Sequence, residues 1–214
     1  MKTLLLAALT VGCALGTQPA PRPQATPAQA GALDAQQAEF DASKARAELL
    51  FAQGAYALAH TEYESARAFA QAPADVRWAE FRLADTQWRA LAATGSDDSS
   101  GIDAARTALN VLVRDIARED ERDRVFLEVH ESLGDLAWRE NSQDWGTAWA
   151  SYQLALDGWG ASAELELARR RYLDIVWKTV TPRGIGGWER GRWVPTPDEV
   201  IENAIRIAEA SDDR

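Results

Sequence analysis

The chain has 214 residues, of which 46% are hydrophobic and 26% charged, and these ordinary globular proportions exclude wholesale disorder. Two large globular domains would not fit into this length. The formal net charge of −10 argues against sequence-independent binding of nucleic acid and against binding to anionic membrane surfaces, because both need a positive field. We therefore expect a single acidic domain with no nucleic-acid partner.

The first 32 residues are predicted to precede the folded domain. Lys2 is followed by the apolar run LLLAALTVGCALG (4–16), which is the pattern of a signal peptide and is too short to span a bilayer permanently. The next stretch, TQPAPRPQATPAQAGA (17–32), is typical of a semi-extended linker. The sequence therefore predicts a signal peptide (1–16), a linker (17–32) and a folded domain (33–214) in a protein exported to the periplasm or envelope of a bacterium.

The single cysteine, Cys13, leaves two ways of processing this leader open. The stretch TVGC (10–13) places a small residue before the cysteine, as bacterial lipoproteins do, so Cys13 is a candidate for lipidation and membrane anchoring. The alternative is cleavage after ALG (14–16), which removes the cysteine. In both cases the folded domain has no disulfide, no thiol chemistry and no transmembrane span.

A short phrase recurs within the predicted domain, as LADTQWR (83–89) and LGDLAWR (133–139). Its order, a small residue, a charged residue and an aromatic residue three positions later, starts at Ala47, Ala84, Gly134 and Ala168. Each copy lies in an apolar pattern of helical period and is followed by a second such pattern, in which large and small residues alternate. Because this alternation lets two antiparallel helices pack closely, we predict an all-α fold of helical hairpins.

The third unit has Leu133-Gly134 in its first helix and Ala148, Tyr152 and Ala155 in its second, and it resembles the tetratricopeptide repeat, a helix-turn-helix of about 34 residues. The first unit matches through Gly54 at the turn. The resemblance covers about residues 36–178 and implies a short right-handed solenoid of about three and a half hairpins. The sequence departs from the repeat in two long turns, 94–101 and 179–196.

In the resembled family, the charged residue of the phrase and the aromatic residue after it tend to lie on the inner surface of the stack. Carried over by position, the predicted partner-binding groove comprises Glu48, Phe51, Asp85, Trp88, Arg89, Asp135, Trp138 and Arg139. Such a groove would hold an extended peptide or a partner helix. The alternative is that each Asp pairs with the Arg four residues later on its own helix and that the two Trp are core residues.

The turn 179–196 carries a basic and aromatic cluster in an otherwise acidic protein, namely Arg183, Trp188, Arg190, Arg192 and Trp193. One interpretation is a contact site for an acidic partner or a sugar, because Trp rings stack on sugars and Arg pairs with carboxylates. The other is that Trp188 and Trp193 cover the exposed end of the stack, as a terminal repeat must. The sequence leaves both open.

Motifs for catalysis or metal binding are missing from the sequence. His60 and His130 are seventy residues apart and neither belongs to a metal-ligand motif. The glycine-rich RGIGGWERG (183–191) lacks the lysine of a phosphate-binding loop, and no nucleophile motif occurs. We therefore expect no enzyme and no cofactor, but non-catalytic binding of another envelope or secreted protein. The alternative is a glycan- or peptidoglycan-binding module that uses Trp188 and Trp193.

A second similarity concerns RWAEFRLADTQWRA (77–90) and NVLVRDIAREDERDRVFLEVHESLGD (110–135). These segments look like the helical repeats that precede the main body of some bacterial envelope proteins of the alpha-2-macroglobulin type. The thioester motif by which that family traps proteases is absent. This similarity therefore implies an accessory N-terminal region that docks a larger protein.

Overall fold

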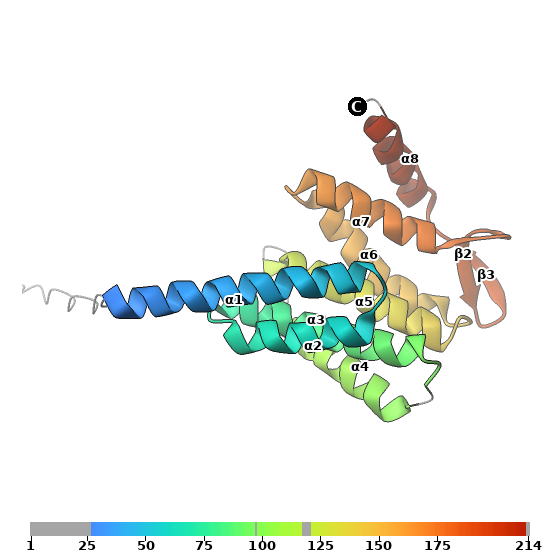
Figure 1. The fold of residues 1–214 in the computed structure, drawn as a ribbon. Coiled ribbons are helices and arrows are strands. Elements are labelled where there is room, and N and C mark those ends of the chain that lie inside the picture. The colour runs from blue at the N-terminus through green and yellow to red at the C-terminus, as the bar shows by residue number, and fades with distance from the viewer. Residues whose placement is uncertain (1–26, 97, 117–120, 213–214) are drawn as a thin grey trace, which may run out of the picture.

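The computed structural model describes residues 27–96, 98–116 and 121–212. These residues form eight helices and a small sheet (Figure 1). The helices are α1 (Pro27–Ala52), α2 (Tyr56–Phe69), α3 (Pro73–Ala93), α4 (Ser99–Val113), α5 (Arg124–Glu140), α6 (Trp145–Ala161), α7 (Leu165–Lys178) and α8 (Asp198–Asp212). The strands are β1 (Val180–Thr181), β2 (Gly184–Glu189) and β3 (Arg192–Pro195).

The expected mainly helical fold is confirmed, with one correction to the all-α prediction. The segment 179–196, expected to be an irregular turn, contains a three-stranded antiparallel sheet in the order β1-β2-β3. Helix α1 begins at Pro27, so residues 27–32 are helical although we expected them in the linker. The expected signal peptide (1–16) and Cys13 lie outside the described residues. Among the described residues, no helix is both long and apolar enough to cross a membrane.

Local signals in the sequence account for several helix ends. Gly54 and Gly95 follow α1 and α3 with φ of 74° and 65°, the left-handed conformation that glycine adopts at little cost after a helix. Asp98 and Asp123 precede α4 and α5, and each accepts a hydrogen bond from the backbone N–H three residues later. Glycines therefore end α1 and α3, and aspartate N-caps begin α4 and α5.

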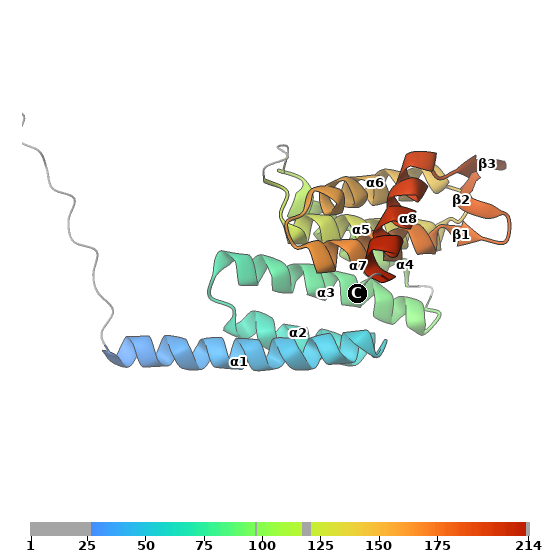
Figure 2. The same ribbon diagram turned by 90° about the horizontal axis from the view of Figure 1, so that it is seen from above.

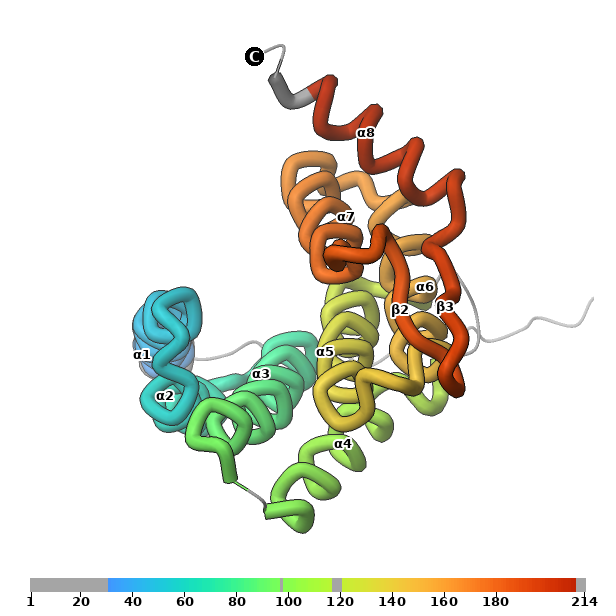
Figure 3. Tube along the Cα trace, turned by 90° about the vertical axis from the view of Figure 1, so that its right-hand side faces the viewer, coloured from blue at the N-terminus to red at the C-terminus, as the bar shows by residue number. Residues whose placement is uncertain are grey.

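Each helix packs against the next one along the chain, from α1 on α2 to α7 on α8, and α3 also packs on α5. In Figure 3, α1, α3, α5 and α7 follow one another along a curved row, with α2, α4 and α6 outside them. Two apolar clusters fill the interior, one among α1 to α5 and the other mainly among α5 to α8. Helix α5 joins them, since its Val129 and Leu136 belong to the first cluster and its Phe126 to the second.

The small residues that open the repeated phrase are helix-packing positions. Ala47, Ala84, Gly134 and Ala168 are all buried. A Cβ atom added to Gly134 would lie 2.6 Å from the ring of Tyr152 on α6. The missing side chain at this position therefore lets α5 and α6 approach closely.

The sheet rests on α6 and on the end of α5 through a glycine. A Cβ at Gly187 of β2 would lie 2.5 Å from the ring of Trp138 and 2.6 Å from that of Trp145, so the strand backbone covers both rings. The neighbouring Glu189 accepts a hydrogen bond of 2.6 Å from the backbone N–H of Gly146, in the first turn of α6. Gly187, which the sequence places in a glycine-rich turn, thus allows β2 to pack closely on two tryptophan rings.

Helix α1 extends well beyond α2 (Figures 1 and 2). Residues 31–39 are exposed, and Phe40 is the first buried residue of the helix. Among the side chains of α1 whose burial is described, those from Phe40 onward contribute to the core.

We predict that Gly134→Ala destabilises the protein by about 1–3 kcal/mol, because the new methyl group would overlap the ring of Tyr152. The measurement is the free energy of unfolding in urea, followed by circular dichroism. Gly160→Ala on α6 is the matched control, since nothing lies within 4 Å of its added Cβ. Equal stability of the two variants would contradict the close approach of α5 and α6.

Candidate functional site

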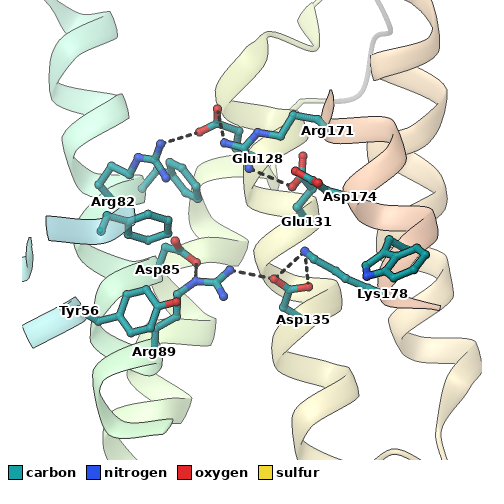
Figure 4. Close-up of a pocket in the computed structure, with 13 residues that line it drawn as sticks. Tyr56, Arg82, Asp85, Arg89, Glu128, Glu131, Asp135, Arg171, Asp174 and Lys178 are labelled. Carbon is teal, nitrogen blue, oxygen red and sulfur yellow. Dashed lines mark hydrogen bonds and ion pairs between the residues drawn. The ribbon is translucent and has the colours of Figure 1, made fainter. Parts of the chain in front are cut away.

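A groove with a cavity volume of about 330 Å³ lies across α3, α5 and α7, with residues of α1 and α2 at one end (Figure 4). Most of its lining residues are charged, and the rest are aromatic. They are Phe51, Tyr56, Phe81, Arg82, Asp85, Arg89, Glu128, Glu131, Asp135, Arg171, Asp174, Trp177 and Lys178. We call this surface the groove.

One set of ion pairs crosses the groove from α3 to α7. Arg89 Nε donates to Asp85 Oδ1 at 2.8 Å, and Arg89 Nη2 donates to Asp135 Oδ2 at 2.9 Å. Lys178 Nζ donates to both carboxylate oxygens of Asp135, at 2.8 and 3.0 Å. The two acids of the repeated phrase are therefore bridged by one arginine.

A second set of ion pairs runs beside the first and begins on α1. Arg82 Nε lies 3.0 Å from Glu48 Oε1, and Arg82 Nη2 lies 3.4 Å from Glu128 Oε2. Arg171 Nη2 lies 3.2 Å from Glu128 Oε1, and Arg171 Nη1 lies 3.3 Å from Glu131 Oε2. We call the two sets together the ion-pair network, and it connects α1, α3, α5 and α7.

Tyrosines of the outer helices hold two of these acids in place. Tyr63 of α2 donates its hydroxyl to Glu48 Oε1 at 3.0 Å, and Tyr152 of α6 donates to Asp135 Oδ1 at 2.7 Å. These tyrosines occupy equivalent positions of the first and third hairpins. Glu48 and Asp135 are therefore each hydrogen-bonded to the helix that follows their own, α2 and α6.

The pKa values of the groove acids are shifted in different directions. Burial opposes the ionisation of Asp135 and Glu128, but the neighbouring cations outweigh it and lower both pKa values. At Glu131 burial dominates and raises the pKa to about 7, although Arg171 and Lys178 act against it. Glu131 therefore titrates near neutral pH inside the groove.

Five of the eight residues predicted for the groove lie in it or beside it. Phe51, Asp85, Arg89 and Asp135 line it, and Glu48 pairs with Arg82 at its edge. Arg89 fits both interpretations of the charges. It pairs with Asp85 four residues earlier on its own helix, and it also pairs with Asp135 of α5 in the groove. The corresponding pair of Asp135 with Arg139 is not formed: Asp135 binds Arg89 and Lys178, and Arg139 donates to a backbone carbonyl of α3.

Trp88, Trp138 and Arg139 do not line the groove, which favours the alternative that the two Trp are packing residues; of the expected aromatic row, only Phe51 lines the groove. Trp88 is 4% exposed, and its Nε1 donates to Ser132 Oγ of α5 at 2.9 Å. Trp138 packs edge to face on Trp145 under the sheet, with ring centroids 4.9 Å apart. Trp88 lies about 60° around the helix from Asp85, and both side chains contact Ser132, so the tryptophan is buried against α5 next to its acid.

Several lining residues were not predicted, although a helical spacing connects them to the repeated phrase. Arg82 lies three residues before Asp85, and Glu131 lies four residues before Asp135, so each shares a face with its acid. On α7 the fourth copy of the phrase carries Arg169 in place of an acid, so the sequence pattern does not indicate which residues of α7 face the groove. The lining residues of α7 are Arg171, Asp174, Trp177 and Lys178.

The basic and aromatic cluster lies on the sheet, outside the groove. Trp188 and Trp193 are cross-strand partners, half-buried, with centroids 5.9 Å apart and an interplanar angle of 79°. Arg183 lies 4.6 Å over the ring of Trp188, and Arg190 and Arg192 are exposed. Gly187 of the same strand, and not either sheet tryptophan, packs on Trp138 and Trp145.

The histidines are not groove residues. His60 Nδ1 lies 3.0 Å from the hydroxyl of Thr86, and His130 packs against Phe126. Burial lowers the pKa of His130 to about 4, so this imidazole is neutral at pH 7. In the part of the chain that the structure describes, no group of three or more His, Cys, Asp or Glu side chains is placed to hold a metal ion.

We predict that Trp88→Ala lowers the free energy of unfolding by about 3–5 kcal/mol, because it empties a core position and removes the donor to Ser132. Trp177→Ala is the control, since this side chain is 76% exposed, and it should change the stability by less than about 0.5 kcal/mol. Urea unfolding followed by circular dichroism measures both. A mild effect at Trp88 would place its side chain outside the core.

We predict that Glu131→Gln stabilises the protein relative to wild type increasingly as pH rises from about 5 to about 7.5. The pKa of Glu131 in the folded state, about 7, lies above its ordinary value of 4.5, so the folded state binds a proton more tightly than the unfolded state. The stability that Glu131 contributes is thus fully present below about pH 4.5 and is lost as pH rises through about 7.

Urea unfolding of both proteins across this pH range gives the measurement for Glu131→Gln. The difference between the two isolates Glu131 from the other carboxylates, because Asp135 and Glu128 have lowered pKa values and titrate at more acidic pH. A difference in stability that does not change with pH would show that Glu131 titrates normally.

Comparison with known proteins finds no family, no curated protein and no solved structure that matches this chain. Function is therefore inferred from the chemistry of the groove and from the pattern of the sequence.

Proposed function

We propose that this chain is a non-catalytic scaffold that binds another protein in the groove. The observation that carries the proposal is the position of the groove, which crosses α3, α5 and α7 and is reached by Phe51 of α1 and Tyr56 of α2. Charged and aromatic side chains from successive hairpins thus form one concave surface. We further propose that the hairpins form a short right-handed solenoid of about three and a half tetratricopeptide-like units, in which such a surface recurs from unit to unit.

The charges of the groove are held in fixed positions, which favours specific recognition. Arg89 has two carboxylate partners on two helices, and Asp135 has two cationic partners and a tyrosine donor. A partner therefore meets side chains that are already ordered, so that less conformational entropy is lost on binding. Polar groups arranged in this way set the register of a bound segment more than its affinity.

Aromatic side chains at the groove supply surface for affinity. Trp177 is 76% exposed on α7, and Tyr56 lines the opposite end next to α1. Tryptophan and tyrosine are enriched among the residues that dominate binding energy at protein interfaces. The groove thus combines ordered charges in its floor with an exposed aromatic residue at its edge.

The apolar leader at residues 4–16 supports export, so the proposed partner is an envelope or secreted protein. The proposed role also fits the accessory docking region that the similarity to alpha-2-macroglobulin-type proteins implies. The alternative of a glycan site at Trp188 and Trp193 has weaker support, because stacking on sugars needs a free ring face. Arg183 lies over the ring of Trp188, and the two rings are inclined by 79°.

We predict that a photo-crosslinking residue, p-benzoyl-phenylalanine, captures a protein partner when it replaces Trp177. The tagged full-length chain would be expressed in its native host and irradiated there, and crosslinked species would be identified by mass spectrometry. One reproducible partner is expected, because Trp177 is exposed at the edge of the groove.

Leu58 is the matched control position for the crosslinking experiment. It is 62% exposed on α2 and does not line the groove. The same partner captured equally from Leu58 would show that binding does not depend on the groove. Capture from neither position would contradict the scaffold function, and binding of purified cell wall that is lost in Trp188→Ala would then support the glycan alternative.

A further inference from the structure

Two hollows meet at the exposed side of α7. Asp174 and Trp177 line the groove, and both also line a second hollow of about 490 Å³ between α7, the first two strands and α8. The other residues of this second hollow are apolar: Leu173, Val176, Val180, Ile185, Ile201, Ala204, Ile205 and Ala208. We call it the α7–α8 hollow. The charged groove and the apolar hollow thus share one wall.

The α7–α8 hollow leaves apolar side chains in contact with solvent. Trp177 is 76% exposed and Ile205 is 53% exposed. The main packing partner of α8 is α7, whereas α4 and α6 each pack between two helices. Exposed apolar side chains gathered around a hollow are typical of an interaction site.

The charges beside the hollow favour a cationic partner. The four cations that line the groove, Arg82, Arg89, Arg171 and Lys178, all pair with carboxylates of the ion-pair network. Asp174 is an exposed carboxylate that has no ion-pair partner among the described residues. Asp174 is therefore the carboxylate of the groove that is left without a cation among the described residues, and it lies at the wall shared with the hollow.

We propose that the segment bound by this protein carries a lysine or arginine that pairs with Asp174, followed within a few residues by a large apolar side chain that enters the α7–α8 hollow. This proposal rests on the scaffold function and adds the chemistry of the partner. Trp177 serves both parts, because it lines both hollows and the face of an aromatic ring attracts a cation. An acidic segment would meet Asp174 with like charge, and a purely polar one would leave the hollow uncovered.

The test is a selection from random dodecapeptides displayed on phage, with the folded, full-length protein as the target. We expect the enriched peptides to share Lys or Arg followed within three residues by Leu, Ile, Phe or Trp. A synthetic peptide of the enriched sequence should bind at least about tenfold more weakly to Asp174→Asn and to Trp177→Ala than to wild type, measured by fluorescence anisotropy. Both side chains are exposed, so the variants should fold like wild type.

Asp41→Asn is the matched control, because this exposed aspartate lies on α1 and does not line the groove. It should leave the affinity of the enriched peptide unchanged. Enrichment of acidic peptides that still depend on Trp177 would overturn the cationic partner and leave the scaffold function standing. The absence of any enriched peptide would overturn the inferred segment, and crosslinking from Trp177 would then decide whether the groove binds protein at all.

A second copy of this chain is another occupant that the experiment must separate, since the exposed Arg190 and Arg192 lie on the sheet of the same protein. Sedimentation velocity of the purified chain, without peptide, makes this distinction. A dimer that dissociates in Arg192→Glu and in Asp174→Asn would assign the wall to a second copy and overturn the proposal. A monomer at the concentrations used for peptide binding is the expected result.

Discussion

A buried charge needs an opposite charge beside it, and this requirement governs the arrangement of the helices. Arg82 and Glu128 are both almost fully buried, and each pairs with charges on further helices. Removing one member of such a pair typically costs about 3–5 kcal/mol, because its partner is left unpaired in a medium of low polarity. The spacing of α1, α3, α5 and α7 is therefore fixed by charges as well as by apolar packing. The same charges form the floor of the groove, so the surface that we propose for binding is also structural.

The repetition of LADTQWR and LGDLAWR has a mainly structural explanation. In both copies the small residue sits against a neighbouring helix, the acid joins the ion-pair network, and the tryptophan packs away from the groove. The arginines differ, because Arg89 joins two helices whereas Arg139 lies at the surface. Of the phrase, only the acid lines the groove in both copies.

Much of the helical framework could be predicted from local patterns, since the spacing of small and large residues depends on the helix alone. Asp85, Arg89 and Asp135 could be placed together because they occupy equivalent turns of successive units. Their partners could not, because Arg171 and Lys178 lie in a copy that lacks the acid and reach the network only through the fold. A core position for Trp88 was one of two interpretations of the sequence, and only its contact with Ser132, distant in the sequence, distinguishes them. The strand at Gly187 was missed for a related reason, because its close packing depends on the distant Trp138 and Trp145.

The exposed N-terminal part of α1 sets the distance between the helical core and the start of this helix. The stretch from Pro27 to Phe40 is helical and rises by ~1.5 Å per residue, so it spans about 20 Å. Because residues 31–39 are exposed, this part is a stiff spacer rather than part of the core. An attachment at the start of α1 would stand off from the helical body by about two helix diameters, which leaves room for a second protein to approach.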